Sequence, residues 1–206
     1  MNFHQEVRMI PDPEVGLGFL WMKSYTQIHL ALVEYINNID SDGLGIAFPE
    51  YNHDEKAPRK STLGHSLKIS AKDTNALAKL DLATWLKRLE GYVTVSEIIR
   101  SDQLEKHITF TRYQPKNQAR LRRMLRRRMD SLGENEEQAQ SHISQLAAEK
   151  TTLPFIQLES LSNLQAFRIF IKKNEASEQK DGSFTTYGLS KAVSYTHLTL
   201  PTTPYV

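Results

Sequence analysis

The sequence predicts an α+β protein whose N-terminal part is a ferredoxin-like domain. Strand-like and helix-like segments follow one another over the first hundred residues in the order strand, helix, strand, strand, helix, strand. That order is the split βαβ (βαββαβ, RRM-like) arrangement, in which two helices cover one face of a four-stranded sheet. A half of different composition follows, and we expect it to be α+β as well, with an arginine-rich helix.

The first strand and the first helix are predicted from prolines and from periodicity. Residues 3–10 form a strand that ends before Pro11. Asp12 is the expected N-cap of a helix that runs to about Asn38, with Pro13 in its first turn, where the missing N–H costs little. Apolar residues return at helical spacing along this segment, namely Trp21, Tyr25, Ile28, Leu32 and Tyr35.

Two strands, a helix and a fourth strand complete the first domain. Residues 43–51 and 65–71 form a hairpin-like pair on either side of a polar loop. The next helix is expected to begin after Asp73, which can cap it, and to end before Gly91. Residues 92–99 are rich in β-branched side chains, which favour a strand.

The second half is predicted to contain four strands and two helices. In order these are a strand at 107–114, an arginine-rich helix at about 115–130, a polar helix at 131–150, and strands at 153–160, 165–173 and 183–190, the last of which ends in a glycine turn. We therefore expect a ferredoxin-like domain at 1–100 and a second domain at 101–191. The last residues, 192–206, resemble a translated sequencing-adapter read-through and are expected to be a non-native tail; a genuine extended tail is the alternative.

Composition excludes several classes of function. The chain has 206 residues and no cysteine, so a disulfide framework, thiol catalysis and a cysteine–zinc site are excluded. The seven histidines show no metal-ligand spacing, and there is no P-loop or GxGxxG motif, so we expect no metal and no nucleotide cofactor. No signal-peptide pattern and no membrane-spanning apolar run are present, which predicts a cytoplasmic protein without a membrane partner.

The positive charge of the chain is concentrated between residues 112 and 129. The whole chain has 26 basic and 24 acidic residues, a net charge of +2, and this segment holds eight of the basic residues and no acidic one. They are Arg112, Lys116, Arg120, Arg122, Arg123, Arg126, Arg127 and Arg128. A solvated charged face usually mixes both signs, whereas a surface of one sign suits a polyanion. We interpret the segment as a helix that binds in the major groove of an RNA hairpin, at a point where a distortion or a loop widens that groove. The alternative is a solvent-exposed charged face without a binding function.

Arg112 and Gln114 precede this helix and lie on the same side of an extended segment. Arginine pairs bidentately with guanine and glutamine with adenine, both at major-groove edges. The pair is therefore a candidate for reading bases.

Three further residues could carry chemistry, and each also has a structural interpretation. His29 can act as a general base, since imidazole titrates near neutrality, or it can be a helix histidine partly buried beside the core. Ser160 follows a predicted strand in a polar turn, where most serines serve the turn itself. Tyr187 precedes Gly188 and can equally be a packing tyrosine.

Short motifs spread over residues 3–191 resemble the type I-F CRISPR repeat-processing endoribonucleases, the Csy-four or Cas-six f family. Each motif is short, but their order and spacing along the chain are specific. They are PDPE (11–14), IHLALV (28–33), GIAFPE (45–50), RYQ (112–114), RLRRMLRRR (120–128), LPFIQLES (153–160), FRIFI (167–171) and FTTYGLSK (184–191).

The resemblance implies an enzyme that cuts precursor CRISPR RNA at the 3′ base of each repeat stem-loop without a metal ion. A ribose 2′-hydroxyl attacks the neighbouring phosphate and leaves a 2′,3′-cyclic phosphate. The resemblance makes His29 the general base, assigns Ser160 to the ribose of the attacking hydroxyl, and gives Tyr187 the task of orienting the imidazole or the active-site backbone. The enzyme is then expected to stay on the hairpin as a subunit of a multi-subunit RNA-guided surveillance complex.

The resemblance also assigns recognition. Arg112 and Gln114 are expected to read the lowest purines of the stem, and Phe167 to stack on its terminal base pair. On the arginine helix, the family pattern matches best at three positions, Arg123, Arg127 and Arg128. Met124 is a departure, because the pattern has an arginine there, and the expectation is that Arg126 compensates for it.

Two rival functions keep the basic helix but change its use. The first is a non-catalytic RNA-hairpin-binding subunit of the same kind of complex. The second is a regulator that reads duplex DNA with the basic helix.

Overall fold

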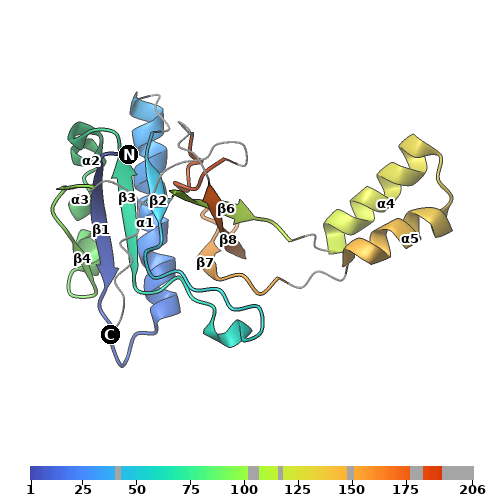
Figure 1. Ribbon diagram of the computed structural model, residues 1–206, viewed down its shortest axis with the longest axis horizontal. Coiled ribbons are helices and arrows are strands. Elements are labelled where there is room, and N and C mark those ends of the chain that lie inside the picture. Colours follow the sequence, from blue (N-terminus) through green and yellow to red (C-terminus); the bar gives the residue numbers. More distant parts are fainter. Residues whose placement is uncertain (40–42, 102–106, 116–117, 148–150, 177–182, 192–206) are drawn as a thin grey trace. The chain divides into compact units, whose positions relative to one another are not determined.

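The computed structural model describes residues 1–39, 43–101, 107–115, 118–147, 151–176 and 183–191, which form an α+β protein with two antiparallel sheets (Figure 1). The predicted α+β class is confirmed. The described residues up to Tyr113 and from Leu153 onward form one compact unit, and Gln114–Thr152 form another. This division differs from the predicted boundary at residue 100, because strands of the second half share a hydrophobic core with the first half.

The first sheet is built around a central strand, β1 (Phe3–Met9). On one side β1 pairs with β3 (Ser66–Ala71), and β3 pairs in turn with β2 (Gly45–Ala47). On the other side β1 pairs with β4 (Val93–Val95) and, at its beginning, with the short β5 (Ile99–Arg100). All these pairs are antiparallel, and the strand order is β2-β3-β1-β4.

The long helix α1 (Leu17–Ile39) begins later than the sequence predicts. The Asp12 carboxylate accepts hydrogen bonds from the backbone N–H groups of Glu14 and Val15, at 2.8 and 2.9 Å, and so closes a separate turn before the helix. The predicted helix start at Asp12 is therefore wrong, although Asp12 does satisfy backbone donors as a capping residue would.

The second predicted helix is two short helices, α2 (Thr74–Leu80) and α3 (Leu82–Leu86), followed by a 3₁₀ turn at Lys87–Leu89. Asp73 caps α2 by accepting a hydrogen bond from the Ala76 N–H at 2.8 Å, as the sequence predicts. Asp81 interrupts the helix because it takes the left-handed conformation, with φ of 45°, which aspartate tolerates better than most residues.

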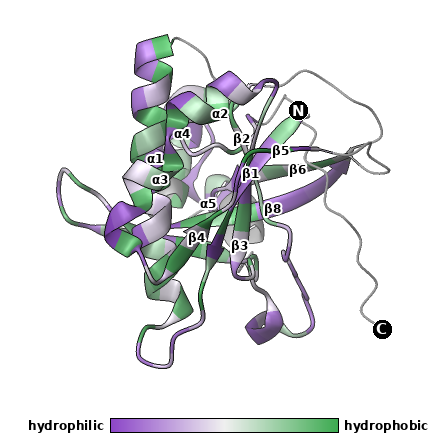
Figure 2. Cartoon of the chain, turned by 90° about the vertical axis from the view of Figure 1, so that its left-hand side faces the viewer, coloured by the Kyte–Doolittle hydropathy of each residue, from purple (hydrophilic) through white to green (hydrophobic). Residues whose placement is uncertain are grey.

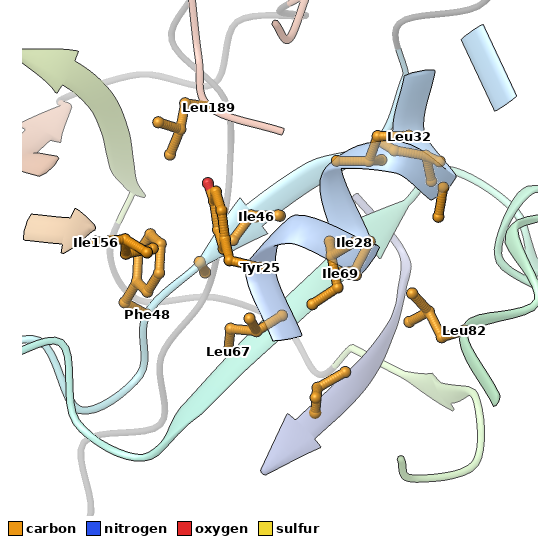
Figure 3. Packing of buried hydrophobic residues seen from close by; sticks show 14 of the residues in the cluster. Tyr25, Ile28, Leu32, Ile46, Phe48, Leu67, Ile69, Leu82, Ile156 and Leu189 are labelled. Atoms are coloured by element: carbon orange, nitrogen blue, oxygen red, sulfur yellow. The ribbon is translucent and has the colours of Figure 1, made fainter. Parts of the chain in front are cut away.

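The second sheet consists of β6 (His107–Tyr113), β8 (Ala166–Ala176) and β7 (Phe155–Glu159), with β8 in the centre. The helix α1 packs against the first sheet and also against β7. The α1 residues Tyr25, Ile28 and Leu32 therefore share one core with residues of both sheets. These include Ile46, Ile69 and Ile156, and Phe48, which directly follows β2, belongs to the same core (Figure 3). Figure 2 shows hydrophobic and hydrophilic residues on different sides of α1, as expected for an amphipathic helix.

The segment predicted as a last strand, 183–190, is instead a tight turn, which we call the C-terminal turn. Its strand-like features are isolated bridges from Ser190 to Phe184 and to Thr111. Gly188 has φ of +67° and closes the turn by donating from its N–H to the Thr185 carbonyl at 2.8 Å. The predicted strand is wrong because a backbone with positive φ reverses the chain within this short stretch.

The second unit is a pair of helices, α4 (Gln118–Leu132) and α5 (Glu136–Ala147), joined through Gly133. Asn135 caps α5 by accepting a hydrogen bond from the Gln138 N–H at 2.8 Å, and the Gln138 side chain accepts one in return from the Asn135 N–H. Leu121 of α4 and Ala139 of α5 are buried.

Glu50 links the loop after β2 to the first sheet. Its carboxylate accepts hydrogen bonds from Arg8 at 3.0 Å, from the His65 N–H at 2.7 Å and from the Ser66 hydroxyl at 3.3 Å. Burial tends to raise the pKa of the Glu50 carboxyl, but the His65 N–H and the Arg8 charge outweigh burial, so this pKa lies below its ordinary value.

We expect Glu50→Gln to lower the melting temperature at pH 7, and to lower it less near pH 3. Because the folded-state pKa is depressed, the ionised carboxylate stabilises the fold above its unfolded pKa, and this contribution is lost as the pH falls through the folded-state pKa. Thermal unfolding followed by circular dichroism at both pH values measures the difference, with the exposed Glu55→Gln as control. An equal loss at both pH values would contradict the ionic role of Glu50.

Candidate active site

His29 lies on α1 and is oriented by a hydrogen bond to the C-terminal turn. Its Nδ1 lies 2.8 Å from the carbonyl oxygen of Thr186. Because a carbonyl oxygen can only accept, Nδ1 must carry the proton of this bond. In the neutral imidazole Nε2 then keeps its lone pair, so the ring can accept a proton from a substrate at Nε2.

The ring of Tyr187 stacks on the ring of His29. The two ring centroids are 4.1 Å apart and the planes differ by 8°. The stack and the bond to Thr186 restrain the imidazole in different ways, since one fixes the plane of the ring and the other its rotation within that plane. Both come from consecutive residues of the C-terminal turn, so the placement of this turn determines the geometry of His29.

Tyr25 connects this turn to α1. It lies one helical turn before His29, on the same side of the helix. The Tyr25 hydroxyl donates a hydrogen bond to the Tyr187 carbonyl at 2.8 Å. Burial, together with the neighbouring Tyr187, raises the pKa of Tyr25 well above its ordinary value, and Arg112 opposes this shift. The hydroxyl therefore stays protonated and remains a donor.

We expect Tyr25→Phe to lower the free energy of unfolding by about 1–2 kcal/mol, because the partly buried Tyr187 carbonyl loses the hydrogen bond from the buried Tyr25 hydroxyl. Denaturant unfolding of the variant and the wild type measures this loss. Tyr92→Phe is a matched control, since Tyr92 is exposed. Equal losses in the two variants would show that the Tyr25 hydroxyl contributes nothing specific.

Arg112, one of the two residues predicted to read bases, lies next to the catalytic candidate Tyr187. It lies on β6 and is exposed, and its guanidinium carbon is 5.5 Å from the centre of the Tyr187 ring. Tyr187 therefore contacts both Arg112 and His29. Gln114, which the sequence groups with Arg112, follows β6 and is also exposed, but it belongs to the second compact unit.

Ser160 lies in the turn between β7 and β8. Its hydroxyl is 3.0 Å from the Ser162 hydroxyl, and its N–H donates to the Gln165 carbonyl at 2.9 Å. Within the described part of the chain, His29 and Tyr187 are therefore in contact, but Ser160 makes no hydrogen bond to either of them. Phe167, on β8, pairs with Leu158 and packs partly buried against the core.

The arginines of α4 fall into two groups. Arg123, Arg126 and Arg127 are exposed. Arg128 instead forms a bidentate ion pair with Glu134, with Nε–Oε2 at 2.7 Å and a second nitrogen at 2.5 Å from Oε1. The hydrogen bond that Arg128 donates to the Glu134 carboxylate raises the pKa of Arg128 above its ordinary value. Arg120 and Arg122 belong to α4 but their side chains are not described, and Lys116 lies outside the described residues.

Sequence reasoning missed two partners of this site. The Thr186 carbonyl is a backbone group, and no residue type predicts it. The apolar periodicity of the helix predicts only a packing role for Tyr25. Its spacing of four residues from His29 is the sequence signal for a second role, because it places both residues on one side of the helix.

The described residues contain no group of three or more His, Asp or Glu side chains that could hold a metal ion. Among the helices that the structure describes, none is both long and apolar enough to cross a membrane.

Comparison with known proteins gives the family. Residues 4–202 match the family described as CRISPR-associated protein (Cas_Csy4), so the match continues past Lys191 into the predicted tail. The CRISPR-associated endonuclease Cas6/Csy4 of Pseudomonas aeruginosa (strain UCBPP-PA14) is 33% identical over 193 residues, which cover 93% of this chain and 96% of that protein. The protein of the same name from Escherichia coli (strain UTI89 / UPEC) is 29% identical over 191 residues, covering 92% and 96%.

A solved structure described as an RAMP protein binding different RNA substrates aligns with 92% of this chain and 97% of its own, with a TM-score of 0.33 and 13% identity. The family match and the two full-length relatives agree with one another. The chain therefore belongs to the Cas_Csy4 family of CRISPR-associated endonucleases, as its resemblance predicted.

Proposed function

We propose that this protein cleaves precursor CRISPR RNA at the 3′ base of each repeat stem-loop, without a metal ion. In this reaction His29 Nε2 takes the proton of a ribose 2′-hydroxyl, and the 2′-oxygen attacks the adjacent phosphorus. The bond to the 5′-oxygen breaks, that oxygen takes up a proton, and a 2′,3′-cyclic phosphate remains. The single observation that carries the proposal is the bond from Nδ1 to the Thr186 carbonyl, because it leaves Nε2 as the proton acceptor.

Tyr187 and Ser160 have supporting roles in this proposal. Tyr187 fixes the plane of the imidazole by stacking. Ser160 binds the ribose that carries the attacking hydroxyl; its support is that it directly follows β7, a strand that packs against the His29 helix. Its present partner, the Ser162 hydroxyl, can be exchanged for a ribose hydroxyl without leaving a buried group unsatisfied, since the bond is exposed.

We also propose how the two units share the work. The first unit contains a ferredoxin-like module, which is supported by the strand order β2-β3-β1-β4 and by the helices that follow β1 and β3. The exposed arginines of α4 bind phosphates in the groove of the hairpin. Arg112 and Gln114 read purines at the foot of the stem, and Phe167 stacks on its last base pair.

The ion pair of Arg128 separates it from its neighbour Arg127. We expect Arg127→Gln to weaken hairpin binding and to reduce the slope of log affinity against log salt by about one phosphate contact. Arg128→Gln is expected to change the slope less, because its guanidinium is already paired with Glu134. Fluorescence anisotropy at several salt concentrations measures both slopes, and a larger change in Arg128→Gln would reverse the assignment.

Cleavage in the absence of metal tests the function. Purified protein is mixed with a repeat stem-loop RNA in EDTA, and a second RNA carries a 2′-deoxy nucleotide at the cut site. We expect the first RNA to be cut and the second to be bound but left intact. Intact RNA of both kinds under stoichiometric protein would favour the non-catalytic hairpin-binding subunit, and equal affinity for duplex DNA at about 0.15 M salt would favour the DNA regulator.

The product should stay bound after the cut. The groove and base contacts proposed above lie upstream of the scissile bond, so cleavage removes none of them. A protein that retains its hairpin can serve as a subunit of an RNA-guided surveillance complex in the cytoplasm. Native gel electrophoresis after cleavage measures retention, and release of the hairpin on the time scale of cutting would contradict the subunit role.

A further inference from the structure

The second sheet has a face that the proposed active site does not use. Ile156 of β7 pairs with Ile169 of β8, and both are fully buried in the core. Side chains alternate between the two faces of a strand, so the residues next to these two point to the opposite face. Phe155 and Phe170 are therefore neighbours on that opposite face, which lies away from the core.

An aromatic row crosses all three strands on this face. Phe155 of β7 pairs with Phe170 of β8, and Phe170 pairs with Tyr113 of β6. The rings of Phe155 and Phe170 are 5.4 Å apart and tilted by 58°. Phe155 is 42% exposed, so part of its ring is accessible to a ligand.

Positively charged side chains lie on both sides of the aromatic row. Arg168, two residues before Phe170, places its guanidinium 4.5 Å from the centre of the Phe155 ring. Lys172, two residues after Phe170, is also exposed. Glu159 is the acidic member of this face. It pairs with Ala166, four residues along β7 from Phe155. The part of the face around the row therefore combines flat apolar rings with positive charge.

We propose that this aromatic row binds single-stranded nucleotides that flank the repeat hairpin. Bases of any sequence can stack on an exposed aromatic ring or on a guanidinium plane, and neighbouring cations neutralise the backbone phosphates. The two cations beside the rings favour RNA over a protein as the ligand of this face, because RNA brings a phosphate with every nucleotide. The inference rests on the proposed function, since it extends the same substrate beyond its hairpin.

The test compares a bare repeat hairpin with the same hairpin carrying single-stranded nucleotides on both sides, each with a 2′-deoxy nucleotide at the cut site. We expect the full-length protein to bind the flanked RNA at least about fivefold more tightly, since one stacked base contributes that much. Phe155→Ala should remove this gain and leave affinity for the bare hairpin unchanged. Lys172→Gln, which removes no packing, should reduce the salt dependence of the gain.

Phe19→Ala is the matched control. Phe19 is 50% exposed on α1 and has a similar cation contact, with the Lys23 ammonium 5.4 Å from its ring centre. The gain should persist in this variant. If the wild type binds the bare hairpin and cuts an all-ribose flanked RNA but gains no affinity from the flanks, the inference fails while the proposed function stands. If it neither binds the bare hairpin nor cuts the all-ribose flanked RNA, the proposed function fails. A wild-type dimer that Phe155→Ala dissociates in sedimentation would overturn the inference and assign the face to a second copy.

Discussion

His29→Ala is expected to slow cleavage of repeat RNA by about 10²–10⁴-fold, the range that a general base contributes, with little change in the dissociation constant. The physical reason is the division of roles in the structure. The imidazole offers Nε2 to the substrate, while the proposed groove and base contacts come from other residues. Single-turnover cleavage with excess protein measures the rate, and anisotropy with a 2′-deoxy RNA measures the affinity.

A histidine in another part of the fold provides the control for this variant. His53 lies in the loop after β2, and His53→Ala should cut at the wild-type rate. An affinity loss as large as the rate loss in His29→Ala would mean that His29 is structural. The affinity must be measured for this reason, because the imidazole also bonds to Thr186 and stacks on Tyr187.

Gly188→Ala is expected to lower the free energy of unfolding by about 2–4 kcal/mol, the sum of a strained backbone and an overpacked core. Gly188 has φ of +67°, and a Cβ there would lie 2.6 Å from Ile46 Cγ1 and 3.2 Å from Leu32 Cδ1. Its carbonyl also accepts a hydrogen bond from the Ile46 N–H at 2.7 Å, so the turn cannot move away without losing this bond.

The same substitution should reduce the rate of cleavage by the molecules that remain folded. A shift of the C-terminal turn displaces the Thr186 carbonyl and the Tyr187 ring together, and these two groups orient His29. Gly91→Ala is the matched control, because Gly91 also has a positive φ, of +89°, but apart from Gly91 and its two chain neighbours no atom of the described residues lies within 4 Å of its added Cβ. We expect Gly91→Ala to lose only about 1 kcal/mol and to cut normally. Equal losses of stability would show that the contact with Ile46 is unimportant.

Local signals in the sequence predicted most elements of the first unit, but not where each one ends. The apolar stripe of α1 and the Asp73 cap of α2 are local features, and both predictions are confirmed. The break at Asp81 and the reversal at Gly188 depend on positive φ values. A non-glycine residue at positive φ leaves no clear mark in composition, so the break at Asp81 could not be predicted. The sequence does indicate a glycine turn at Gly188, but only as the end of a strand, because a glycine is compatible with both signs of φ.

The candidate site depends on contacts between distant parts of the chain. His29 and Tyr187 are far apart in sequence, and only the family resemblance put them in one site; no periodicity could do so. Contacts between distant segments also unite both sheets around one core, so the observed division into units differs from the boundary predicted at residue 100. Arg128 pairs with Glu134, which lies in the loop between α4 and α5. Glu134 is outside the basic segment, so the number of charges within that segment does not reveal the pair.

The connection of the helical pair to its sheet has a consequence for how such enzymes diversify. The segment Gln114–Thr152 leaves the first unit at the end of β6 and returns just before β7, and these strands flank β8 on its two sides. Because lengthening a surface connection costs little free energy, this segment can be exchanged or resized while the strands at its ends stay paired. If the helical pair holds the hairpin as we propose, proteins of this family that serve different repeats are expected to differ most within this segment and least around His29.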